Sequence, residues 1–229
     1  MSLAAELRAA AADVWEAQHA HPFVRGIGDG TLDEARFRFY VRQDYRFLID
    51  YARLLALGTA RAPRVEEMRR FAGLSHSVLE TEMALHVGFA ERWGIAAEEL
   101  ESEPVAPATA AYTDFLLRTA ALGDYAELVA ALLPCMWGYA EIGARLASAG
   151  MPDHPGYTTW IAMYADPEFQ ALAAWARELT DAAGADAGPG AAERMHAAFR
   201  ASSEHELAFW ESAWRYEGGD SGRPLARGA

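Results

Sequence analysis

The chain has 229 residues, of which 52% are hydrophobic, and its formal net charge is -13. This length and composition suit one large domain with a packed core. The acidic balance argues against nucleic acid as a partner, because binding to phosphates requires clustered basic residues, and the absence of lysine excludes Schiff-base chemistry and a P-loop. The single cysteine cannot form an internal disulfide, and no stretch has the unbroken apolar run of a signal peptide or membrane span. We therefore expect a cytoplasmic protein with no membrane partner.

The spacing of apolar residues predicts helices along nearly the whole chain. Apolar residues recur every three or four positions, and no stretch shows the sustained alternation of a strand. The pattern predicts helices at about 2–20, 32–60, 64–93, 108–121, 124–149, 157–180 and 191–216. We therefore expect an all-α protein built as a single-domain bundle of about seven helices.

Residues that begin and end helices support these ranges. Thr31–Glu34 has the pattern of a capping box, and Pro63 suits the first turn of the third helix. Gly94, Gly123 and Gly150 stand where predicted helices stop.

No long linker or internal repeat divides the chain. We expect residues 1–217 to form the single domain, 181–190 to be a flexible connection, and 218–229 to be a disordered tail.

An aspartate interrupts an aromatic face in the second predicted helix. One face carries, at helical spacing, Phe37, Tyr40, Asp44, Phe47 and Tyr51. A buried carboxylate without a partner is unfavourable, so Asp44 should reach water at a cleft or hold a hydrogen-bond donor. A salt bridge to an arginine of a neighbouring helix would be a purely structural alternative. Asp50 lies off this face and is expected to be solvated.

The last predicted helix repeats this arrangement with a glutamate. Its face carries Phe199, Ser202, Glu206, Phe209 and Ala213, whereas Glu204 and Glu211 lie off it. An apolar setting raises the pKa of a carboxyl group, which would let Glu206 donate a proton near neutral pH. An internal ion pair is again the structural alternative.

The cysteine lies in the apolar stretch LLPCMWGYAEIG (132–143). A free cysteine in such a setting is commonly inert, but Pro134 should kink the helix beside Cys135, and Tyr139 follows one turn later. A thiol, two carboxyl groups and several aromatic rings around one cavity would suit a flat heteroaromatic ligand.

Four motifs together resemble the TenA family, the thiaminase II group. They are HPFVRGIGDGTLDEARFRFYVRQDYRFL (21–48), LLPCMWGYAEIG (132–143), WIAMYADPEF (160–169) and SEHELAFWESAW (203–214). The resemblance covers roughly residues 15–216 and implies a heme-oxygenase-like fold.

The resemblance also implies roles for individual residues. Cys135 matches the nucleophile, Asp44 the residue that binds the aminopyrimidine edge, and Glu206 the acid of the last helix. Tyr112 and Phe209 match the rings that stack on the ligand, and Tyr139 and Tyr164 match tyrosines that orient the thiol and the acid. Phe47, also expected to contact the substrate, stands where some members carry a tyrosine, so a hydroxyl is missing there.

The chemistry implied is hydrolysis of the C–N bond at the methylene of an aminopyrimidine. The expected substrates are 4-amino-5-aminomethyl-2-methylpyrimidine and thiamin, and the product is hydroxymethylpyrimidine for thiamin salvage. The resemblance implies that the reaction needs no metal and no organic cofactor, and that the protein is a homotetramer.

Three alternatives remain at this stage. A di-iron oxidase would draw ligands from the pairs His76 and Glu80, Glu82 and His86, and Glu193 and His196. A heme protein would use His19 or His21, although His21 belongs to the HPF motif of the TenA family and is expected to pack at a helix start. A protein that binds the pyrimidine without catalysis would not require Cys135.

Overall fold

Three long helices form the frame of the molecule: α4 (Glu34–Arg61), α9 (Tyr125–Ala149) and α12 (Ala191–Arg215). The computed structural model describes residues 2–188 and 190–216, which form twelve α-helices, one π-helical segment and no strand. The remaining elements are α1 (Leu3–Ala10), α2 (Ala12–His19), α3 (Pro22–Asp29), α5 (Val65–Ser77), η1 (Val78–Glu82), α6 (Met83–Arg92), α7 (Ala97–Glu101), α8 (Pro107–Leu122), α10 (Pro155–Ala165) and α11 (Pro167–Ala185). The all-α class is confirmed.

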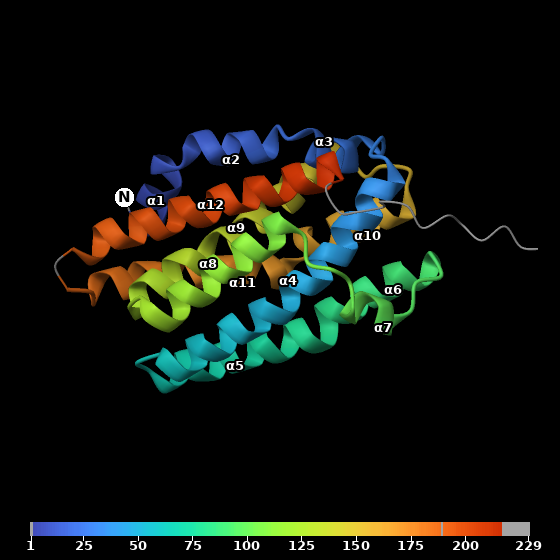
Figure 1. The fold of residues 1–229 in the computed structure, drawn as a ribbon. Coiled ribbons are helices and arrows are strands. Elements are labelled where there is room, and N and C mark those ends of the chain that lie inside the picture. The colour runs from blue at the N-terminus through green and yellow to red at the C-terminus, as the bar shows by residue number, and fades with distance from the viewer. Residues whose placement is uncertain (1, 189, 217–229) are drawn as a thin grey trace, which may run out of the picture.

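Helix α9 is the centre of the bundle. It packs against α8, α10, α11 and α12, and α4 packs against α5, α6 and α8. In Figure 1, α2 and α12 run along one side of the bundle and α4 and α5 along the other. Nearly every turn of α9 carries buried residues on several faces, as expected for a helix enclosed by others. Pro134 stands inside α9, which continues without interruption to Ala149.

The number of helices differs from the prediction because three predicted ranges contain breaks. The range 2–20 divides at Ala11 into α1 and α2, and 157–180 divides where Pro167 begins α11. Pro167 has no N–H to donate to the preceding turn, and the carboxylate of Asp166 caps the new helix by accepting the N–H of Glu168. The range 64–93 contains the π-helical segment η1.

Other boundaries were predicted with mixed success. Gly123 and Gly150 are the C-terminal caps of α8 and α9, as expected. Asp33, rather than Thr31, caps α4, and Pro63 precedes the N-cap of α5.

The short helices α3 and α7 were not predicted, and α11 extends into the expected connection at 181–190. The tail expected at 218–229 lies outside the described residues.

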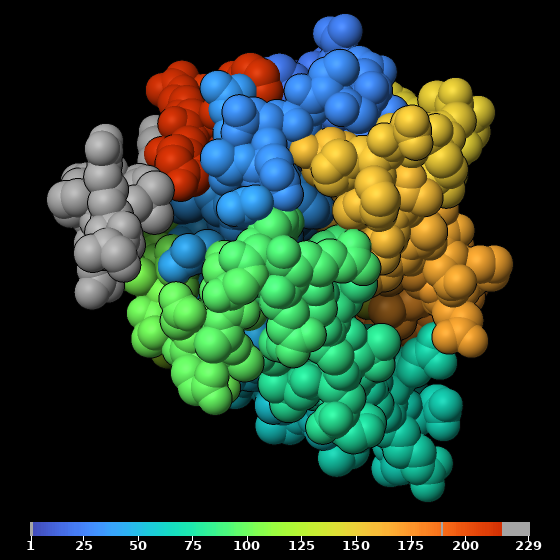
Figure 2. All heavy atoms as spheres, turned by 90° about the vertical axis from the view of Figure 1, so that its right-hand side faces the viewer, coloured from blue at the N-terminus to red at the C-terminus, as the bar shows by residue number. Residues whose placement is uncertain are grey.

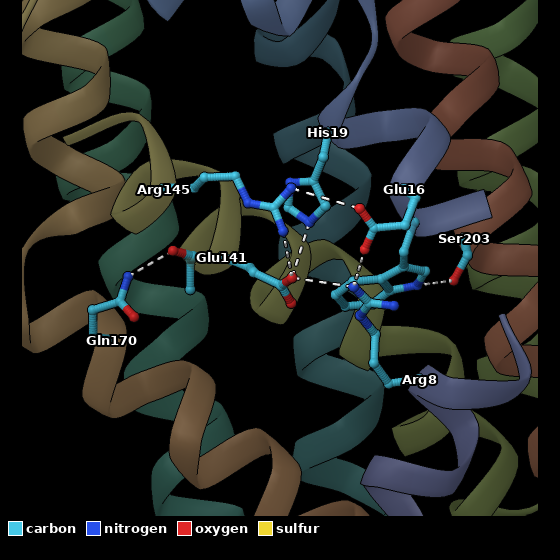
Figure 3. Close-up of polar contacts among 9 residues, drawn as sticks. Arg8, Glu16, His19, Glu141, Arg145, Gln170 and Ser203 are labelled. Carbon is cyan, nitrogen blue, oxygen red and sulfur yellow. Dashed lines mark hydrogen bonds and ion pairs between the residues drawn. The ribbon is translucent and has the colours of Figure 1, made fainter. Parts of the chain in front are cut away.

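A charged cluster fastens the N-terminal helices to α9 (Figure 3). An oxygen of Glu141 on α9 accepts hydrogen bonds from Arg8, at 3.1 Å, and from His19, at 3.0 Å. Burial raises the pKa of Glu141, but these hydrogen bonds outweigh burial and bring it to about 2. Gln170 adds a bond from α11 to the carbonyl of Ala140, also drawn in Figure 3. These contacts fix the position of α9, which carries the cysteine.

Two apolar clusters form most of the core, and each of the long helices contributes to both. One contains Phe47 of α4, Met136 of α9 and Phe199 of α12, and the other contains further residues of the same three helices. Asp44 and Glu206, which the sequence placed on apolar faces, each stand in the chain between a residue of one cluster and a residue of the other. None of the helices in the described part of the chain is long and apolar enough to span a bilayer.

The close packing of α9 against α10 at Gly143 predicts that this position tolerates no side chain. A Cβ atom at Gly143 would lie 2.6 Å from the carbonyl carbon of Tyr164, so Gly143→Ala should lower the free energy of unfolding by about 1–3 kcal/mol. Gly73 on α5 is the matched control, because its Cβ would meet nothing within 4 Å and alanine there should stabilise the helix. Urea unfolding of both variants measures the effect, and a Gly143→Ala protein as stable as wild type would contradict this packing.

Candidate active site

A cavity with a volume of about 40 Å³ lies among α4, α5, η1, α9, α10 and α11. Five residues that sequence analysis assigned to the site line it: Asp44, Phe47, Cys135, Tyr139 and Tyr164. The other lining residues are mainly apolar, with Tyr51 and Glu82 as the additional polar ones. The structure therefore brings together residues that are 120 positions apart in the chain.

Cys135 belongs to the wall of this cavity and not to the sealed core. The residue is only partly buried, and it lines the cavity. Burial raises the pKa of the thiol well above its usual value, and the negative charges of Glu206, Glu82 and Asp44 raise it further. The resting cysteine is therefore a neutral thiol, which needs a base before it can attack.

Asp44 is held by a histidine and a tyrosine, not by the arginine considered from the sequence. Its Oδ2 lies 2.6 Å from Nε2 of His86 and accepts the hydroxyl of Tyr40 at 3.2 Å. Both contacts use Oδ2, so Oδ1 makes no hydrogen bond to another described residue. Asp44 can therefore present Oδ1 to a ligand while remaining fixed in orientation.

The state of His86 follows from its two partners. Nδ1 lies 2.8 Å from the carbonyl oxygen of Glu82, which can only accept, so Nδ1 carries a proton. Burial lowers the pKa of His86, but the hydrogen bond to Asp44 and the charge of Asp44 outweigh burial and raise it. The raised pKa favours the imidazolium form of His86, paired with the Asp44 carboxylate.

Glu206 is a buried acid with no cationic partner among the described residues. Its Oε1 accepts the hydroxyl of Tyr112 at 2.7 Å. Burial raises the pKa of Glu206 to about 8, with a further contribution from the charge of Asp44, while the hydrogen bond from Tyr112 and the interaction with Cys135 oppose the increase. The apolar face of the helix predicted this increase in the pKa of Glu206. Among the described residues, the alternative of an internal ion pair is wrong. Asp50 is half-buried and pairs with Arg53, whereas Glu204 is exposed as expected.

The expected stacking rings lie behind the wall of the cavity. Tyr112 and Phe209 are buried but do not line it. Phe47 separates them from the cavity, with its ring centre 5.0 Å from that of Tyr112 and 6.1 Å from that of Phe209. Access to these rings from the cavity therefore requires the side chain of Phe47 to move.

Glu82 is a second buried acid, which sequence analysis noted only as half of a possible metal-binding pair. It lines the cavity and accepts the hydroxyl of Tyr164 at 3.3 Å. Burial raises the pKa of Glu82 to about 7, and the charge of Asp44 adds to this. The acid that Tyr164 contacts is thus Glu82 rather than Glu206. The Tyr139 ring packs on the Tyr164 ring, with centres 4.8 Å apart.

A broad groove lies outside the cavity, between α5 and η1 on one side and α10 and α11 on the other. The groove and the cavity share three lining residues, namely Leu74, Phe169 and Leu172. Figure 2 shows this face hollowed between the teal and green surface of α5, η1 and α6 and the orange surface of α11. These three apolar side chains separate the cavity from the groove.

The residues considered for metal or heme binding do not form such a site. Within residues 2–188 and 190–216, no group of three or more His, Cys, Asp or Glu side chains is arranged to hold a metal ion. His19 and His21 do not line the cavity; His19 pairs with Glu141, and His21 caps α3 and pairs with Glu211. The expected structural role of His21 at a helix start is confirmed.

Comparison with known proteins agrees with this architecture. The TENA/THI-4/PQQC family model matches residues 8–216. A protein of Halalkalibacterium halodurans named aminopyrimidine aminohydrolase is 43% identical, over 95% of this chain and 100% of its own. A solved structure of a TenA homologue from P. horikoshii OT3 is 30% identical, with a TM-score of 0.86 over 94% of this chain and 99% of that one.

The fold extends to more distant proteins. A domain from Shewanella denitrificans described as having a heme oxygenase-like fold superposes with a TM-score of 0.74 at 14% identity, covering 96% of this chain and 98% of that one. The predicted heme-oxygenase-like fold is therefore confirmed. Because the family model matches residues 8–216, the protein belongs to the TENA/THI-4/PQQC family.

Proposed function

We propose that this protein is an aminopyrimidine aminohydrolase that replaces the amine on the methylene of 4-amino-5-aminomethyl-2-methylpyrimidine with a hydroxyl group. The product, hydroxymethylpyrimidine, would return to thiamin synthesis, and thiamin itself is a second candidate substrate. The observation that carries the proposal is the place of Cys135, on a cavity wall and interacting with a buried acid, Glu206. The name and high identity of the relative from H. halodurans support the reaction class.

Cys135 and Glu206 divide the chemistry between them. As the sulfur adds to a ring carbon, Glu206 in its carboxylate form takes the thiol proton and passes it to a ring nitrogen. The electron pair that enters the ring then expels the amine from the methylene, and water adds to the methylene carbon. Loss of the sulfur restores the aromatic ring and the thiol, so the net change is water in and ammonia out. A pKa of about 8 lets Glu206 both accept and donate a proton near neutral pH.

Substrate orientation comes from Asp44 and the aromatic side chains. Oδ1 of Asp44 would accept a hydrogen bond from the exocyclic amine while Oδ2 stays bonded to His86 and Tyr40. Tyr112 and Phe209 would stack on the pyrimidine ring after Phe47 moves aside, with Phe47 then a contact at the edge of the ring.

Two tyrosines complete the site. Tyr139 and Tyr164 line the cavity beside Cys135 and would orient the thiol and the attacking water. Because the hydroxyl of Tyr164 contacts Glu82, that acid would hold Tyr164 in place.

We also propose that the protein is a cytoplasmic homotetramer. Three of its exposed large apolar side chains, Val65, Met68 and Leu79, lie on α5 and η1, where a subunit contact would cover them. Light scattering on the purified protein measures the mass, and a monomer would contradict the tetramer.

Substitution of the thiol tests the reaction. Cys135→Ser should lower hydroxymethylpyrimidine formation by orders of magnitude, because a hydroxyl is a far weaker nucleophile than a thiol. Glu206→Gln should lower the rate by about 10²–10⁴-fold, whereas the matched control Glu204→Gln, on the exposed face, should retain the wild-type rate. Product is measured from the aminomethylpyrimidine and separately from thiamin. If wild type binds the pyrimidine but forms no product, the protein is a binding protein and the proposed reaction is wrong.

The pKa of Glu206 predicts how stability depends on pH. Its pKa is about 4.5 when unfolded and about 8 when folded, so its contribution is fully present below pH 4.5 and is lost as the pH rises toward 8. The loss should be on the order of a few kcal/mol. Glu206→Gln should therefore be more stable than wild type at pH 8.5, and the advantage should shrink toward pH 4.5. Unfolding in urea across this pH range measures the difference in the free energy of unfolding. The control Glu204→Gln should show the same dependence of stability on pH as wild type.

A further inference from the structure

The hydroxyl of Tyr51 is a feature of the cavity that the proposed reaction leaves without a role. Tyr51 lies on α4, one turn after Phe47, and lines the cavity with 5% of its surface exposed. Its hydroxyl is buried and has no hydrogen-bond partner among the described residues. A buried hydroxyl without a partner is unfavourable, so its presence at a cavity wall requires an explanation.

The neighbour that explains it is the thiol. Burial raises the pKa of Tyr51 most, and Cys135 raises it further, more than any other residue does. Interaction with Tyr51 in turn lowers the pKa of Cys135. Interaction with Cys135 also lowers the pKa of Glu206. Cys135 and Tyr51 line the same cavity, which brings a hydroxyl donor to the side of the sulfur, while the interaction with Glu206 provides a proton acceptor.

No other residue of α4 can supply this donor. The α4 residues that line the cavity are Asp44, Phe47, Leu48, Tyr51 and Leu55, of which Tyr51 alone has a hydroxyl. The ring of Phe47 stacks on that of Tyr51, with centres 5.5 Å apart and an angle of 21° between the planes. A hydroxyl on Phe47 would therefore lie on the same wall, one turn earlier.

The charges around the sulfur make a donor necessary. Glu206 from α12, Glu82 from η1 and Asp44 from α4 all disfavour a negative sulfur, and no arginine lines the cavity. The imidazolium of His86 is already bonded to Asp44. A neutral hydroxyl can stabilise the thiolate without adding a charge to this interior.

We propose that Tyr51 is a positioning residue for the nucleophile, and that its hydroxyl donates a hydrogen bond to the sulfur of Cys135 when Glu206 takes the thiol proton. Tyr51 keeps its own proton throughout, and no bond to it forms or breaks apart from this hydrogen bond. The role in turnover rests on the proposed hydrolase function, whereas the effect on the thiol does not.

The decisive measurement is the rate at which iodoacetamide alkylates Cys135 as a function of pH. The chain has one cysteine, so the labelled site is unambiguous. Tyr51→Phe removes only the hydroxyl and should shift the alkylation profile to higher pH, which lowers the rate at a fixed pH by about ten- to hundredfold. In turnover of the aminomethylpyrimidine, kcat should fall with little change in KM.

Two further variants separate positioning from packing. Tyr45→Phe makes the same change at a residue that is also buried on α4 but lies in a different apolar cluster, and it should leave the profile unchanged. The double variant Tyr51→Phe with Phe47→Tyr returns a hydroxyl to the same wall and should restore part of the lost rate.

An alkylation profile of Tyr51→Phe identical to wild type would overturn the proposal, as would an equal shift in Tyr45→Phe. If wild type forms no product but Tyr51→Phe still shifts the alkylation profile, the proposed hydrolase function is wrong. The role of Tyr51 beside the thiol is then still supported.

Discussion

The burial of three carboxyl groups in one apolar interior, two of them at the wall of the cavity, is the constraint on which the rest of this structure depends. Asp44, Glu82 and Glu206 share an apolar interior in which the described residues provide one cation, His86, and it is bonded to Asp44. Unpaired charges in such a place are too unfavourable to persist, so Glu82 and Glu206 retain their protons to near-neutral pH. The fold thereby places two protonated carboxylic acids, which can give up and take back a proton near neutral pH, close to a thiol.

The position of each carboxyl group follows from the helix that carries it and from a nearby tyrosine. Asp44 and Glu206 take their positions from the period of long helices and Glu82 from the end of η1, and the hydroxyls of Tyr40, Tyr112 and Tyr164 each reach one of these acids. The π-helical turns of η1 end at Glu82, and the carbonyl group of Glu82 then fixes the ring of His86. Such segments are frequent at functional sites because they alter which side chains face inward.

Sequence reasoning was most successful where a property depends on one helix alone. The faces bearing Asp44 and Glu206 were predicted from spacing, and both residues are buried. Partners that belong to other helices were not predictable in this way: His86 was noted only as a possible metal ligand, and the π-helical segment leaves no mark in the apolar pattern. Tyr112 and Tyr164 were identified only through resemblance to a family.

Of the breaks between helices, one was also predictable from the sequence and another was not. The break at Pro167 could have been read from the sequence, because proline cannot continue a preceding helix. The division at Ala11 could not, since alanine favours the helix that ends there. The count of about seven helices was therefore too low, although the class was right.

The partition formed by Leu74, Phe169 and Leu172 has a consequence for the timing of catalysis. All three side chains are partly exposed, and they alone are shared by the groove and the cavity. Rotations of exposed side chains take picoseconds to nanoseconds, whereas a typical enzyme turnover takes about a millisecond to a second. If their rotation opens the partition, a ligand in the groove would meet an open passage many times during one catalytic cycle, so this partition would select ligands by size and would not set the pace of turnover.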